Sequence, residues 1–113
     1  MTKEMSKLVP LSIYEKGIDL EPYLGVKEIA WDVDNALKVI DFLIGQKYFI
    51  LGGDVYSIKN QLIQPTYDSW YILKEECIND INDAGNKAKE YILDYYKSNG
   101  GNYLYSIVLD AYE

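Results

Sequence analysis

Histidine and arginine are absent from the sequence, so all 11 basic residues are lysines. Without histidine the chain has no imidazole general base, no imidazole metal ligand and no Ser-His-Asp or Cys-His constellation. Without arginine it has no bidentate clamp for carboxylates or phosphates. Enzyme chemistry would have to rest on carboxylate, tyrosine or lysine side chains, and we therefore expect a protein that is not an enzyme.

Cysteine occurs once, at Cys77, which excludes a disulfide within the chain. Cys77 has no recognisable base partner and falls on the apolar face of a predicted helix, so we interpret it as a buried structural thiol. Residues 1–9 lack the apolar run of a signal peptide, and no stretch approaches the length of a membrane span. These absences predict a cytoplasmic protein that engages no membrane.

Basic charge is also scarce: 18 acidic residues outnumber the 11 lysines, which gives a formal net charge of −7. Phosphate backbones repel such a surface, so nucleic acid is not an expected partner. The 113 residues are 49% hydrophobic, which is enough to build a core. We expect a single domain that spans residues 1–113.

The first half of the chain mixes helical and strand-like patterns. Residues 3–17 are weakly helical and interrupted by Pro10, and residues 26–31 form a short apolar run typical of a strand. Asp32 and Asp34 follow, and the next apolar residues recur at helical spacing as far as Gly45, where the helix should end. The aspartate pair is also typical of a divalent-metal site, but no further carboxylates are specified, so we favour helix capping and predict no metal.

Two glycines follow an apolar block at residues 48–51. Gly52 and Gly53 suit a two-residue hairpin turn, because both positions tolerate positive φ, and a bend or bulge is the alternative. The spacing of these glycines matches neither the dinucleotide-binding fingerprint nor the P-loop. Residues 59–61 predict a second turn, and Pro65 limits the short strand after it.

The second half predicts the clearest helix, from about residue 75 to residue 98, because its apolar side chains follow steps of three and four. Residues 99–101 end it, and residues 103–109 have the apolar character of a central strand. The whole pattern predicts an α+β fold with a mostly antiparallel sheet. A long helix in the C-terminal half packs on one face of that sheet, and a shorter helix precedes the central hairpin.

Acidic and aromatic residues offer the candidate surfaces. Carboxylates form a stripe on the long helix, which is either a solvated face or a docking surface for a basic partner. This stripe consists of Glu76, Asp80, Asp83, Glu90 and Asp94. The 12 tyrosines suit both half-buried sheet positions and interface hot spots, and Trp31 and Trp70 suit a core better than a contact surface.

Three segments taken together resemble the immunity protein 40 family: residues 28–31, residues 51–56, and Trp70 with Tyr71. The likeness extends over about residues 26–108, and the GGDVY block is its most specific part. The resemblance implies a small α+β protein from a bacterial polymorphic toxin system. It also implies a cytoplasmic antitoxin that binds a cognate toxin domain and blocks it by occupancy, without a cofactor.

The residues around the central hairpin are the predicted partner-binding site: Asp54, Tyr56, Tyr67 and Asp68. Asp54 has two interpretations, since its carboxylate can bond backbone amides in a turn or face a partner. We predict no catalytic residue. If the toxin is a nuclease, its basic cleft would attract this acidic surface, and binding should weaken with salt.

A small-ligand-binding or scaffolding module is the alternative function. Its aromatic pocket would be lined by Trp31, Tyr56 or Trp70. Full enclosure of both tryptophans would count against it.

Overall fold

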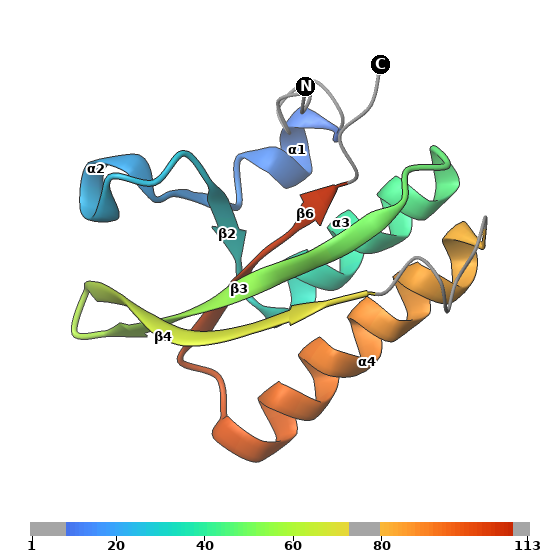
Figure 1. Ribbon diagram of the computed structural model, residues 1–113. Helices are drawn as coiled ribbons and strands as arrows, with labels where there is room; N and C mark the ends of the chain where they lie inside the picture. Colours follow the sequence, from blue (N-terminus) through green and yellow to red (C-terminus); the bar gives the residue numbers. More distant parts are fainter. Residues whose placement is uncertain (1–8, 73–79, 110–113) are drawn as a thin grey trace.

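The computed structural model describes residues 9–72 and 80–109. It contains a six-stranded antiparallel sheet in the order β1-β2-β5-β3-β4, with β6 also paired to β3. The strands are β1 (Ile18–Asp19), β2 (Ile29–Trp31), β3 (Ile50–Lys59), β4 (Leu62–Tyr71), β5 (Tyr103–Ser106) and β6 (Val108–Leu109). Helices α3 (Val33–Gly45) and α4 (Ile81–Asn99) lie together on one face (Figure 1). The predicted α+β fold is confirmed.

Two short helices, α1 (Leu11–Tyr14) and α2 (Glu21–Leu24), precede the main elements. The weakly helical pattern predicted over residues 3–17 corresponds to α1, which begins directly after Pro10. Residues 1–8 lie outside the described part of the chain. Within residues 9–72 and 80–109, no helix has the length and apolar character needed to cross a membrane.

Helix α3 begins where the sequence predicts. The Asp32 carboxylate accepts a hydrogen bond from the backbone N–H of Asn35 at 3.0 Å, which satisfies one of the free donors at the helix start. The buried residues recur at helical spacing: Ala36, Val39, Ile40 and Leu43. Asp32 therefore acts as the helix cap that we favoured.

Helix α4 begins at Ile81, later than the predicted residue 75. Asp80 has a non-helical backbone, and its carboxylate accepts a hydrogen bond from the Asp83 N–H at 2.9 Å, so the helix starts after this cap. The predictions for Glu76 and Cys77 fall outside the described residues. The helix ends as expected, because Gly100 follows it with a φ of 89°.

The hairpin turn predicted at Gly52 and Gly53 is wrong, because both glycines lie inside β3. The turn between β3 and β4 is at Asn60 and Gln61, whose φ values are 52° and 66°. The alternative of a bulge is confirmed, since the pairing of β3 with β6 shifts register between Ile50 and Gly52.

Glycine is required at Gly53 by close packing. A Cβ there would overlap the carbonyl oxygen of Ser106 in β5 and the indole ring of Trp70. Neighbouring backbones and a large ring therefore occupy the space that a side chain would need.

Two further strands differ in length or continuity from what the sequence predicts. Strand β4 continues through Pro65, because β4 is an edge strand and needs no ladder hydrogen bond on its outer side. The single strand predicted over residues 103–109 is two strands separated at Ile107. Its central position is as predicted, because β5 lies between β2 and β3.

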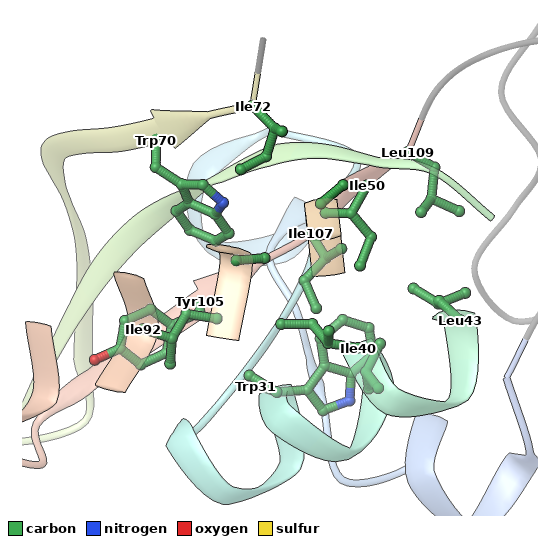
Figure 2. Close-up of a cluster of buried hydrophobic side chains, with 14 of the residues drawn as sticks. Trp31, Ile40, Leu43, Ile50, Trp70, Ile72, Ile92, Tyr105, Ile107 and Leu109 are labelled. Atoms are coloured by element: carbon green, nitrogen blue, oxygen red, sulfur yellow. The ribbon is translucent and has the colours of Figure 1, made fainter. Parts of the chain in front are cut away.

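The main core fills the space between the sheet and the two long helices, and its members include Trp31, Ile40, Trp70 and Tyr105 (Figure 2). Trp31 is 0% exposed and Trp70 is 7% exposed, so both tryptophans are core residues. A smaller cluster lies on the opposite face of the sheet beside α2, and its buried members are Leu20, Ala30, Tyr56, Ile63 and Leu104.

Candidate partner-binding surface

Within residues 9–72 and 80–109, no element covers the face of the sheet opposite α3 and α4 beyond the smaller cluster. In β3, Val55 points into the main core, so Asp54 points to the other side. Asp54 pairs with Ser69, and Gly52 pairs with both Tyr71 and Val108, which places these side chains on the same face. We call Asp54, Ser69, Tyr71 and Val108 the open face; Tyr71 is 75% exposed there.

Asp54 and Tyr56 lie two residues apart on this side of β3. The backbone N–H of Asp54 donates to Ser106 Oγ at 3.0 Å, and the Asp54 side chain is half-buried. Tyr56 is only 6% exposed, and its hydroxyl donates to Glu28 Oε1 at 2.7 Å. Burial and this bond to Glu28 raise the pKa of Tyr56 well above its ordinary value, so the phenol stays protonated and orients the carboxylate.

A large bulge interrupts β4 beside the open face. Asp54 pairs with Ser69 and Tyr56 pairs with Pro65, so Thr66, Tyr67 and Asp68 together oppose a single residue of β3. We call residues 66–68 the bulge segment. Tyr67 has a φ of 68° and is 90% exposed.

Two side chains hold the bulge segment in place. Thr66 Oγ1 donates to the Val55 carbonyl at 2.8 Å and accepts from the Asp68 N–H at 3.0 Å. Asp68 also receives a hydrogen bond from α4, because the Tyr95 hydroxyl donates to Asp68 Oδ2 at 2.8 Å. Burial, followed by this bond to Asp68, raises the pKa of Tyr95 to about 12.

Neighbouring aromatic rings in turn position Tyr95. Its ring meets Tyr103 edge-on with centroids 5.3 Å apart, and meets Tyr105 edge-on at 6.0 Å. Tyr91 stacks against both Tyr95 and Trp70. The Asp68 carboxylate is therefore tied to the packed interior.

The structure separates the four predicted site residues into two neighbouring groups. Asp54 and Tyr56 lie along β3, whereas Tyr67 and Asp68 lie in the bulge segment of the adjacent strand. Their role in partner binding stays a prediction. Sequence reasoning missed Tyr71, although strand alternation from buried Trp70 would have placed it on the outer face.

Glu28 was also missed, because no local pattern connects it with Tyr56. Carboxylates dominate this region: Glu28, Asp54 and Asp68 all lie in or beside the two strands of the hairpin. Strands β3 to β6 contain one lysine, Lys59, at the hairpin end. The surface is thus acidic and aromatic, and it suits a basic partner better than an acidic one.

Other acidic candidates have structural roles or remain untested. Among the residues that the structure describes, no group of three or more potential ligands of the His, Cys, Asp or Glu type surrounds a metal position. On α4, Asp80 is the cap, and Lys89 forms an ion pair with Asp41 of α3 at 2.6 Å. A docking role for the remaining stripe stays a prediction.

Comparison with known proteins identifies the family. Residues 19–109 match the family described as Immunity protein 40, a span that runs from β1 to β6 and includes the open face and the bulge segment. No curated protein and no solved structure matches the chain. The resemblance seen in the GGDVY block and the flanking tryptophans is confirmed over most of the chain, and the protein belongs to the Immunity protein 40 family.

Proposed function

We propose that this protein binds a cognate toxin domain in the cytoplasm and blocks it by occupancy. The family supports an immunity role. The observation that carries the proposal is the open face, which no helix of the described part of the chain covers (Figure 1). This face presents the exposed side chain of Tyr71 beside the Asp54 carboxylate. Tyrosine combines a large apolar body with a polar tip, and it is enriched at interface hot spots.

Electrostatic attraction supports a basic toxin surface as the partner. The net charge of −7 and the scarcity of lysine on strands β3 to β6 favour encounter with a positively charged patch. A stable complex of this kind buries about 800 Å² on each partner. The open face supplies the centre of such an area, and the bulge segment lies at the adjacent edge strand β4, where Asp68 reaches toward α4.

Tyr56 contributes indirectly in this proposal. Its ring is buried in the smaller cluster, while its hydroxyl holds the Glu28 carboxylate in one orientation. A charge that is already oriented loses less conformational entropy when a partner binds it. Glu28, rather than the tyrosine ring, then meets the toxin.

The alternative of a small-ligand module has weaker support. Trp31, Tyr56 and Trp70 were its predicted pocket residues. Both tryptophans are buried in the main core, and Tyr56 is buried in the smaller cluster. The Trp31 indole N–H donates to the Ile13 carbonyl at 3.1 Å, so it is engaged within the fold. Burial of both rings counts against a pocket lined by them.

Co-purification with the toxin domain encoded beside this gene tests the proposal. We expect a one-to-one complex that survives size exclusion and weakens markedly as sodium chloride increases. Asp54→Asn should weaken binding about tenfold, because it removes a carboxylate from the centre of the proposed interface. Glu15→Gln removes the same charge from the exposed residue that follows α1 and is the matched control.

Two results would contradict the proposal. The first is the absence of a complex at micromolar concentrations of both proteins. The second is an equal loss of affinity in Asp54→Asn and Glu15→Gln, because this would show that net charge acts without the open face.

A further inference from the structure

Tyr67 occupies a position that folding alone does not explain. Its φ of 68° is unfavourable for any residue with a Cβ, and its ring is 90% exposed, so little burial compensates. Glycine or asparagine would relieve the backbone at this position. A residue with a Cβ keeps a positive φ mainly where neighbouring residues hold its backbone in place, and such residues cluster at functional sites.

The two sequence neighbours of Tyr67, Thr66 and Asp68, hold its backbone in this conformation. Thr66 connects the bulge segment to the Val55 carbonyl in β3 and to the Asp68 N–H. Asp68 is held by the Tyr95 hydroxyl from α4. The tyrosine between them is therefore presented to solvent on a backbone that is already ordered, which lowers the entropic cost of binding through it.

The edge of β4 argues against a partner that adds a strand. Pro65 lacks an N–H, and the bulge segment breaks the regular ladder immediately after it. Both features are known to protect edge strands from pairing with another chain. A partner at this edge therefore contacts side chains and does not pair with the backbone of β4. A second copy of this chain is for the same reason unsuited to bind here through its own β4.

We propose that Tyr67 is the anchor of the toxin interface, and that its ring enters a pocket on the toxin domain whose rim carries lysine or arginine. The rim charge follows from Asp68, the exposed residue that follows Tyr67 in the sequence, and from the overall charge of −7. Thr66 and Tyr95 are positioning residues, since they act through the bulge segment. This inference rests on the proposed toxin-binding function.

Affinity measurements on three tyrosine variants test the anchor. The probe is the toxin domain encoded beside this gene, immobilised for biolayer interferometry. Tyr67→Ala should weaken binding at least about 30-fold, as expected for a hot spot, whereas Tyr67→Phe should remain within about threefold of wild type. Tyr96→Ala removes another exposed tyrosine, on α4, and should leave affinity unchanged.

A second series tests presentation. Thr66→Val keeps the shape of the side chain but removes both hydrogen bonds, so dissociation should become about tenfold faster. Thr66→Ser keeps the hydroxyl and should restore wild-type dissociation. Tyr67→Gly should melt no lower than wild type while binding as weakly as Tyr67→Ala, a combination that a merely structural role would not produce.

The outcomes separate this inference from the proposed function. If wild type binds the probe and Tyr67→Ala binds equally well, the anchor is overturned and the proposed function stands. If wild type does not bind, both fall. If light scattering shows a wild-type dimer that Tyr67→Ala converts to a monomer, the occupant is a second copy and the inference is overturned.

Discussion

Replacing Gly53 by alanine tests the close packing at the centre of the sheet. The added Cβ would overlap the carbonyl oxygen of Ser106 and the Trp70 ring, whose Cζ2 would lie 2.8 Å away. The ring cannot easily retreat, because it stacks on Tyr91 with centroids 5.0 Å apart. The Ser106 carbonyl belongs to the last residue of β5, which pairs with β3. It can therefore move away from Gly53 only if β5 and β3 separate at this point.

The expected cost can be estimated from these obstacles. Overpacking typically costs 1–3 kcal/mol, and a backbone obstacle places Gly53→Ala near about 3 kcal/mol. Alanine lowers the entropy of the unfolded chain, which offsets about 0.5 kcal/mol. With an unfolding entropy of about 2.1 cal/mol/K per residue over 113 residues, the net loss lowers Tm by about 10 °C.

Thermal unfolding followed by circular dichroism measures this effect, with Gly45→Ala as the control. A Cβ at Gly45, the last residue of α3, meets nothing within 4 Å, so alanine should stabilise the fold by about 0.5 kcal/mol. A Gly53→Ala protein that melts within about 2 °C of wild type would refute the packing argument.

Three further substitutions test individual contacts. Asp32→Ala removes the cap of α3 and should lower the free energy of unfolding by about 1 kcal/mol in urea titrations; no change would mean that the cap is dispensable. Tyr56→Phe should cost about 1 kcal/mol through the lost bond to Glu28, and an unchanged urea midpoint would contradict this. Tyr105→Phe should stabilise the protein by about 1 kcal/mol, since the buried Tyr105 hydroxyl has no hydrogen-bond partner among the described residues. Burial raises the pKa of Tyr105 from 10 to about 12, so the unfolded chain releases this proton first and wild type loses stability as pH rises from 10 to 12. Tyr105→Phe should lose less stability over that range, and an equal loss would show that this hydroxyl does not contribute.

Most features governed by neighbours in sequence were predicted correctly, and the exception is the start of α4, which lies at the Asp80 cap and not at residue 75. Helix α3 has its cap, its apolar spacing and its end within one short segment, and α4 ends at a glycine with positive φ. The α+β class followed from the mixture of these local patterns. The family resemblance rested on short segments, including the GGDVY block of β3.

Features governed by distant residues were predicted wrongly or only as alternatives. Gly52 and Gly53 satisfy the local rule for a turn equally well, and only contacts with Trp70 and Ser106 show that they lie within a strand. The rule against proline in a strand fails at Pro65, because β4 lies at the edge of the sheet.

The sequence by itself determined composition: an acidic, tyrosine-rich chain without histidine or arginine, in which imidazole catalysis is impossible. It did not determine which tyrosines face solvent. Only the tertiary structure placed Tyr105 in the core and Tyr67 on a projecting bulge, because burial depends on strands and helices that meet across the fold. Local patterns select helix or strand, whereas long-range packing decides which side chains remain available to a partner.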